Sequence, residues 1–313
     1  MIVGYMEVFR NLKSVRKDNE CVLTVGTFDG VHLGHQFIIA DLKKRAAAGG
    51  LRTTLVTFEP HPQLVIQSQR KPDLKILTTV EEKLQILQTL QLDRVVVIEF
   101  TEAFSQTSSH EFVNKILFGT IGFQEIVIGY DHAFGKNREG DIATLRKLAS
   151  DVGFRVDELP AFAMDETATS STNIRNLLHA GNAKTASRYL GRNYALNATV
   201  IVGEGRGRRL NFPTANLQPV SNSKLIPGDG VYAVYVQLDQ KKLKGMMNIG
   251  TRPTFGEQHH TIEVHIFDFS ETIYGRQITV EFVDKIRDER RFASAEELMR
   301  QLEDDKNFCL NIF

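Results

Sequence analysis

The feature that most constrains the fold of this chain is a change in the rhythm of its apolar residues near position 188. Before that point, short β-rich runs alternate with amphipathic stretches of helical period. The runs read CVLTVGTF, LRTTLVTF, RVVVIEF, EIVIG and FRVDEL. Strands separated by helices need crossover connections, which predict an α/β domain with a mostly parallel sheet. Such a sheet binds ligands beyond the carboxyl ends of its strands.

After that point, strand-like runs follow one another through turn residues. They read NATVIVGEG, GVYAVYVQL, KGMMNIG, TIEVHIFDF and RQITVEFVDKI. One strongly helical stretch, SAEELMRQLEDD, follows them, and Ser294 and Glu297 are spaced for its cap. This pattern predicts a small antiparallel β-barrel closed by a helix. A chain of 313 residues is about twice the usual domain length, so we expect two domains, 1–186 and 187–313, joined through a helical segment.

The balance of charge argues against two classes of partner. Lysine and arginine number 38, as do aspartate and glutamate, so no net field draws the chain to nucleic acid or to an anionic membrane. Two cysteines are too few for a disulfide framework or a thiolate metal cage. No signal peptide or membrane-spanning run is visible. We therefore expect a cytoplasmic protein that acts on small molecules; a homo-oligomer is compatible with these features.

The run GTFDGVHLGHQ, residues 26–36, falls where the first strand should turn into the first helix. Gly26, Gly30 and Gly34 would let the backbone approach a phosphate, and the helix would point its first amides at the same anion. His32 and His35, three residues apart, would share one face and could donate hydrogen bonds to that phosphate. A surface pair, a cap or an incomplete metal site are the alternatives. The strand-turn-helix setting favours phosphate chemistry.

Two further segments point to the same chemistry. TSSTNIR, residues 169–175, offers the hydroxyls of Ser171 and Thr172 at a probable helix start, with Arg175 one turn later, a set that suits a pyrophosphate. Helix capping would explain one or two of the hydroxyls. In VTFEPHP, Glu59 ends the second strand and could accept hydrogen bonds; a surface glutamate in a turn explains it equally well. In the helix that begins TVEEKLQ, Thr79 and Glu82, or Thr78 and Glu81, are spaced for a capping box.

A second cluster, GRGRRLNFPTANL, opens the later half. Thr214 and Asn216 carry hard oxygen donors close enough to share one small cation, and Mg²⁺ takes few protein ligands while it keeps water and phosphate oxygens. Arg208 and the glycines before it, Gly207 among them, could flank nucleotide phosphates. A polar turn capped by Asn216, with solvated arginines, is an equally good explanation of the residues alone.

Taken together, these motifs resemble one known family. Residues 26–36, 57–62, 128–141 and 170–175 are similar, in wording, order and spacing, to the adenylyltransferase half of bacterial bifunctional riboflavin kinase/FAD synthetases. The later half resembles the kinase half of that family in four segments, residues 207–217, 247–255, 263–269 and 273–292. The resemblance implies a nucleotidyltransferase Rossmann-like domain followed by the barrel. It also implies ATP as co-substrate, Mg²⁺ as cofactor, and riboflavin, FMN and FAD as substrates and products.

The resemblance also implies residue roles. His32 and His35 would stabilise the transferring α-phosphate, and Glu263 would be the catalytic base of the kinase, with Thr214 and Asn216 on the metal. Further nucleotide- and flavin-binding positions that it implies are Gly26, Phe28, Asp29, Gly30, Gly34, Glu59, Asp131, Ser171, Thr172, Arg175, Gly207, Arg208, Asn248 and Arg287. Phe58 and Phe134 are candidates to stack on the flavin ring, or plain core residues.

Three positions depart from the family pattern. Asn211 stands where glycine usually precedes FPTAN, and His132 and Ala133 stand where phenylalanine and arginine are common. Asparagine tolerates left-handed backbone, so we expect the loop around Asn211 to form. The expected function is phosphorylation of riboflavin by ATP, followed by transfer of AMP from a second ATP to FMN. One alternative is a single-activity adenylyltransferase, and the presence of Glu263 with Thr214 and Asn216 argues against it. Another is a silent flavin sensor, and the presence of His32, His35 and Glu263 argues against that.

Overall fold

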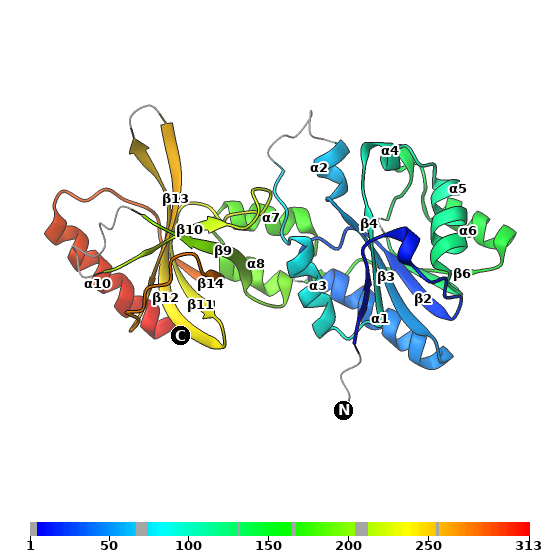
Figure 1. The fold of residues 1–313 in the computed structure, drawn as a ribbon, viewed down its shortest axis with the longest axis horizontal. Coiled ribbons are helices and arrows are strands. Elements are labelled where there is room, and N and C mark those ends of the chain that lie inside the picture. The colour runs from blue at the N-terminus through cyan, green and yellow to red at the C-terminus, as the bar shows by residue number, and fades with distance from the viewer. Residues whose placement is uncertain (1–4, 67–73, 131, 165–166, 204–211, 255–256) are drawn as a thin grey trace. The chain divides into compact units, whose positions relative to one another are not determined.

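The structure is a computed structural model that describes residues 5–66, 74–130, 132–164, 167–203, 212–254 and 257–313. The chain divides into two compact units, Met1–Ser171 and Thr172–Phe313. Each unit has the architecture that its sequence rhythm predicts (Figure 1).

The first unit is built on a sheet of six strands in the order β1-β4-β3-β2-β5-β6, and every neighbouring pair is parallel. The strands are β1 (Glu7–Phe9), β2 (Cys21–Val25), β3 (Arg52–Glu59), β4 (Arg94–Glu99), β5 (Glu125–Gly129) and β6 (Arg155–Leu159). The five expected strands are confirmed, and β1, only three residues long, is the addition. Because β3 and β5 flank β2 on opposite sides, the strand order reverses at β2, where open α/β sheets bind ligands.

Helices cover both faces of this sheet. They are α1 (Leu33–Gly49), α2 (Pro62–Ile66), α3 (Val80–Thr89), α4 (Glu102–Ser105), α5 (Ser109–Glu111), the π-helix η2 (Phe112–Ile121) and α6 (Ile142–Val152). Two short 3-10 turns, η1 (Leu12–Ser14) and η3 (Lys136–Arg138), and the two-stranded β7 (Ala163–Met164) and β8 (Thr167–Ala168) complete the unit.

Alternation along the strands produces two cores. In β4, Val95 and Val97 pack with α1 and α3, whereas Val96 and Ile98 pack with η2 and α6. Successive side chains of a strand point to opposite faces, so a strand buried on both sides has to be apolar throughout. Helix α3 begins with a capping box in which Thr79 accepts from the Glu82 amide and Glu82 accepts from the Thr79 amide, one of the two expected pairs.

The second unit contains α7 (Ser171–His179), which starts at the boundary, α8 (Ala183–Leu190) and a closed barrel of six strands. Around the barrel the order is β10-β13-β12-β11-β14-β9, and every pairing is antiparallel. The strands are β9 (Tyr194–Ile201), β10 (Ala215–Pro219), β11 (Gly230–Leu238), β12 (Lys241–Thr254), β13 (Glu257–Ile266) and β14 (Gln277–Arg287). Helix α10 (Ala295–Ile312) follows, capped by Ser294 as expected.

The barrel has an inner and an outer apolar layer. Alternate strand residues such as Val234, Met247 and Val264 are fully buried. On the other face, Met246 and Phe267 pack with residues of α10 in a separate cluster that includes Cys309. Helix α10 therefore covers part of the outside of the barrel. Among the described residues, no helix has the length and apolar character needed to cross a membrane.

Candidate active sites in the two units

The loop between β2 and α1 carries the first site. The Gly26 amide donates to the carbonyl of Val56 at 3.0 Å, which keeps β2 against β3 until the loop turns. Phe28, Gly30 and Val31 then take left-handed backbone, with φ of 47°, 82° and 39°. Glycine adopts such angles freely, but a β-branched valine does so only under strain. The loop therefore needs support from its surroundings, since strained conformations persist only where neighbours hold them.

His32 and His35 lie together at the start of α1. Their rings are stacked, with centroids 3.6 Å apart and planes 16° from parallel. His32 is the N-cap, and its Nδ1 accepts from the His35 amide at 3.3 Å. The ring of Phe28 packs on His35 at 4.9 Å. The expectation that both histidines share one face is confirmed, and they stand at the positive end of a 17-residue helix, where anions bind.

Gly34 also has a packing role, and its expected approach to a phosphate stays a prediction. A Cβ atom there would lie 3.2 Å from the ring of His32 and 3.4 Å from the carbonyl oxygen of Thr169. The space that glycine leaves is therefore occupied by protein atoms, and Gly34 lets the imidazole and the segment before α7 come close.

Asp29 serves the loop itself. Its buried carboxylate accepts from the backbone amides of Leu77 and Thr78 at 2.9 Å and 3.0 Å, and the Gly30 amide donates to the Thr78 hydroxyl at 3.0 Å. The loop is thereby tied to the turn that leads into α3. Asp29 supports the loop in this way, and Phe28 supports it by packing on the ring of His35. Contact of either residue with a ligand stays a prediction.

Ser171 is brought to the same loop. Its hydroxyl donates to the carbonyl oxygen of Asp29 at 2.9 Å. Thr172 and Arg175 follow it in α7 and belong to the second compact unit, where Thr172 is exposed and Arg175 is buried.

Glu59 is the last residue of β3, next to β2 in the sheet, and is half-buried. Burial raises the pKa of its carboxyl, and the nearby Lys83 ammonium opposes that shift. Phe58 and Phe134, the two candidates for flavin stacking, both belong to one phenylalanine cluster in the core around Phe112. Their packing is that of core residues, which is the second of the two interpretations drawn from the sequence.

The second site is a row of side chains across the barrel. Asn216 of β10 is paired with Glu263 of β13, and Glu263 is paired with Asn248 of β12. Residues directly opposite in antiparallel strands point to the same face of the sheet. Their neighbours Ile262 and Val264 are buried on the other face. The row therefore lies on the outer surface of the barrel, although its members are far apart in sequence.

Thr214 completes the oxygen-rich end of this row. Its hydroxyl donates to Oε2 of Glu263 at 3.0 Å and keeps its own lone pairs as acceptors. A Cβ atom at Gly203 would overlap the amide of Asn216, so glycine there makes room for that side chain. The donors are a hydroxyl, an amide and a carboxylate, all hard oxygens of the kind that Mg²⁺ accepts beside water and phosphate. Over the described ranges, no group of three or more His, Cys, Asp or Glu side chains could hold a metal without such help.

Arg287 lies on β14, paired with Val231, which is itself paired with Asn248. Its guanidinium turns to helix α10, where Nη2 donates to Oδ2 of Asp305 at 2.7 Å. This ion pair fixes α10 to the barrel, and direct contact of Arg287 with a ligand remains a prediction.

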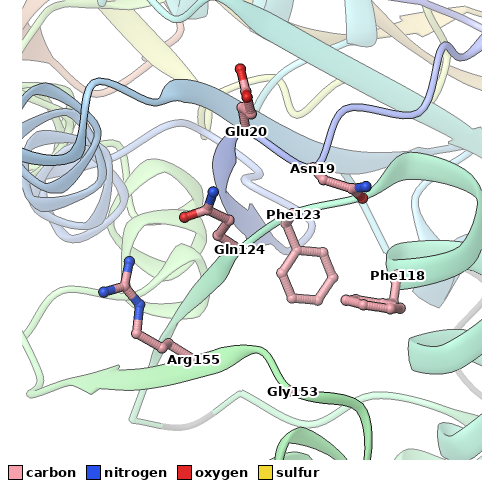
Figure 2. A pocket seen from close by; sticks show the side chains of 7 residues that line it. All are labelled: Asn19, Glu20, Phe118, Phe123, Gln124, Gly153 and Arg155. Atoms are coloured by element: carbon pink, nitrogen blue, oxygen red, sulfur yellow. The ribbon is translucent and has the colours of Figure 1, made fainter.

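The hollow in Figure 2 lies elsewhere, at the amino ends of β2, β5 and β6. It is lined by Asn19, Glu20, Phe118, Phe123, Gln124, Gly153 and Arg155. The loop that leads to His32 and His35 leaves the carboxyl end of β2. The hollow therefore lies at the opposite ends of the strands. It is therefore separate from the site around His32 and His35.

Comparison with known proteins matches the two halves of the chain to two families. Residues 14–173 match the family model described as FAD synthetase, and residues 190–313 match the one described as riboflavin kinase. A bifunctional riboflavin kinase/FMN adenylyltransferase of Listeria monocytogenes is 39% identical over 286 residues, covering 91% of this chain and 90% of that protein. The protein of the same description from Escherichia coli K12 is 36% identical, with 91% and 90% covered. The chain belongs to the bifunctional riboflavin kinase/FMN adenylyltransferase family.

A solved structure shows that the likeness extends to the fold of the whole chain. A protein of Streptococcus pneumoniae described as a macrolide-efflux protein matches with a TM-score of 0.89 and 29% identity, over 98% of this chain and 99% of its own. The efflux activity in that description is a statement about that protein. The two bifunctional relatives are more similar in sequence, and their names agree with the chemistry of the two sites.

Some family positions fall outside the residues that the structure describes, namely Asp131, Gly207, Arg208 and Asn211. One residue that belongs with the adenylyltransferase loop was missed in the sequence. Lys83 is buried, and its ammonium lies under the loop between β2 and α1. A signal was present, because Lys83 lies on the same helical face as Val80, Leu84 and Leu87, where an apolar residue is expected.

Proposed function

We propose that the two activities of this bifunctional flavin enzyme are carried by the two sites separately. The site around His32 and His35 would transfer AMP from ATP to FMN, forming FAD and pyrophosphate. The site around Glu263 would transfer the γ-phosphoryl group of ATP to riboflavin, forming FMN. The observation that carries the proposal is the hydrogen bond from Thr214 to Glu263 in one unit and the stacked histidine pair in the other.

In adenylyl transfer, a phosphate oxygen of FMN attacks the α-phosphorus of ATP, and the bond to the pyrophosphate leaving group breaks. The nucleophile is already ionised, so the reaction needs positioning and charge stabilisation more than a base. His32 and His35 would donate hydrogen bonds to the oxygens that gain charge, beside the first amides of α1. Ser171, Thr172 and Arg175 would hold the leaving phosphates, and Glu59 would help to place the nucleotide or flavin.

In the kinase reaction, Glu263 would take the proton from the 5′ hydroxyl of riboflavin as that oxygen attacks the γ-phosphorus. The Thr214 hydroxyl donates to Oε2 of Glu263 and so orients the carboxylate. Thr214 and Asn216 would hold Mg²⁺ together with phosphate oxygens, and Asn248 would line the same row. When bound, the ion neutralises charge on the phosphates.

Three further assignments belong to this proposal. The sequence places the boundary between the two activities at 186/187, whereas the two compact units meet at 171/172, and we place the protein in the cytoplasm. The two cysteines, Cys21 and Cys309, are free and buried, as suits a reducing compartment. Small molecules are the proposed partners, and self-association is left to direct measurement.

The decisive experiment separates the two sites with two variants. Each would be incubated with Mg²⁺, ATP and either riboflavin or FMN, and the products followed by chromatography. His32→Ala/His35→Ala should lose FAD formation from FMN by about 10²-fold to 10³-fold or more, because transition-state donors are removed. It should still make FMN from riboflavin.

Glu263→Gln should show the reverse. Glutamine keeps the size of the side chain and can accept from Thr214, but it cannot take a proton, so FMN formation should fall about 10²-fold to 10⁴-fold. FAD formation from supplied FMN should stay at the parent rate. Loss of both activities in both variants would contradict separate sites.

A further inference from the structure

Lys83 is a charged side chain in a place that ordinarily excludes charge. It stands in α3 with only 3% of its surface exposed, among Val80, Leu84 and Leu87. A buried ammonium is costly unless it is hydrogen-bonded and faces opposite charge. Both conditions are met here, so the groups that Lys83 contacts indicate its role.

The partners of Lys83 lie at the first site. Its Nζ donates to the carbonyl oxygen of Thr27 at 2.7 Å and to the hydroxyl of Thr57 at 3.1 Å. The Thr57 hydroxyl in turn donates to the same carbonyl at 3.0 Å. Thr27 belongs to the loop that leads to His32, and Thr57 to β3, two residues before Glu59. The three groups form a closed triangle between loop, strand and helix.

The charges around Lys83 come from the same two segments. Burial lowers the pKa of the Lys83 ammonium, while the carboxylates of Asp29 in the loop and Glu59 on β3 oppose the shift. Helix α3 and the turn before it therefore hold the loop at two points. Lys83 donates to the Thr27 carbonyl, and the amides of Leu77 and Thr78 donate to the Asp29 carboxylate. Phe28 and Val31, whose backbone is left-handed, lie next to these two anchors.

We propose that Lys83 is a positioning residue of the adenylyl-transfer site. It holds the strained loop in the conformation that presents His32 and His35 to the nucleotide, and this inference rests on the proposed role of the two histidines. Lys83 itself acts through the Thr27 carbonyl.

The test uses the full chain and Lys83→Met, which keeps the length of the side chain but removes its charge and donors. The turnover of adenylyl transfer should fall about 10-fold to 100-fold, because small misplacements of catalytic groups cost that much. KM for FMN should change little. Riboflavin kinase activity, measured on the same preparation, should be unchanged because its residues lie in the other unit. A parent-like thermal unfolding transition of the first unit reports that this unit is folded.

Two further variants sharpen the result. Thr57→Val removes the hydroxyl of the triangle at nearly constant volume and should lower the same turnover to a smaller extent. The double variant should be about as slow as Lys83→Met alone, because residues of one network are not additive. Lys43→Met is the matched control: Lys43 of α1 is half-buried and donates to the Leu90 carbonyl at 2.8 Å, away from the loop. It should keep the parent turnover.

An unchanged turnover in Lys83→Met, or strict additivity with Thr57→Val, would overturn the proposal. If Lys83→Met does not yield folded protein, Thr57→Val decides the question by itself. A turnover equal to that of the parent in Thr57→Val would then overturn the proposal. The histidine double variant keeps the two ideas apart. Should that variant still make FAD, the proposed function fails; should it lose FAD formation while Lys83→Met does not, only the role of Lys83 fails.

Discussion

At the scale of single residues, His132 shows how burial sets a charge state. Its ring lines a small apolar cavity with Val25, Phe112 and Leu145, and within the described ranges its buried Nε2 has no hydrogen-bond partner. Burial and, to a smaller extent, the charge of Arg138 together lower the pKa of His132 to about 4. The folded protein therefore keeps this histidine neutral at pH values where an unfolded chain would protonate it.

The lowered pKa of His132 determines how the stability of the fold changes with pH. Between about pH 6.5 and about pH 4 the unfolded chain binds a proton at His132 that the folded chain does not, so the free energy of unfolding falls as pH drops through that window. His132→Phe should remove this part of the acid sensitivity, on the order of 2 kcal/mol for a half-buried residue. Calorimetry at about pH 7.5 and about pH 4.5 would measure it. His110→Gln, at an exposed position, should behave as the parent; equal acid losses in parent and His132→Phe would refute the assignment.

At the scale of elements, α10 is held by one ion pair beneath its apolar face. The Arg287 Nε lies 3.0 Å from both carboxylate oxygens of Asp305, and Gln301 donates to the same carboxylate at 2.7 Å. Asp305 is 4% exposed. Removing one partner of a buried pair leaves the other uncompensated, which is why such pairs are costly to break.

Asp305→Asn should therefore lower the free energy of unfolding of the barrel by about 2 kcal/mol, since asparagine keeps part of the hydrogen bonding but not the charge. The control is Glu281→Gln, which breaks the exposed pair with Lys242 and should cost less than about 1 kcal/mol. Thermal unfolding of both variants gives the comparison. Similar small losses of stability in the two variants would show that the pair of Arg287 with Asp305 does not hold α10. They would favour a ligand-binding role for Arg287.

At the scale of the whole molecule, the extent of the barrel unit can be tested. Helix α8 contacts β14, Lys184 pairs with Asp284 at 3.2 Å, and the Gly228 amide donates to the Leu178 carbonyl at 2.9 Å. The boundary expected at 186/187 falls inside α8. The second compact unit, by contrast, starts at Thr172.

A fragment of residues 172–313 should fold and phosphorylate riboflavin. A fragment of residues 188–313 loses α7 and more than half of α8, so it uncovers part of β14 and should melt at a lower temperature. Circular dichroism and kinase assays on both fragments decide between the two boundaries. Equal stability and activity would support the boundary at 186/187.

Much about this protein was determined by local sequence patterns. The alternation of strand and helix in one half and of strand and turn in the other was enough to predict a parallel sheet and an antiparallel barrel, because those periods follow from backbone geometry. The run from Gly26 to Gln36 predicted a histidine pair on one helical face for the same reason. Strands β1 and β10 escaped prediction because one is very short and the other is polar and contains Pro219.

Only the tertiary structure decided which distant residues meet. The row from Asn216 through Glu263 to Asn248 depends on strand order and register, which no local period contains. Lys83 and Asp29 acquire their roles from partners that lie 56 and 48 residues away. The ion pair of Arg287 with Asp305 exists because α10 folds back on the barrel. The local sequence indicates the candidate residues of each site. Long-range packing decides which of them meet, because burial and hydrogen bonding are properties of the assembled fold.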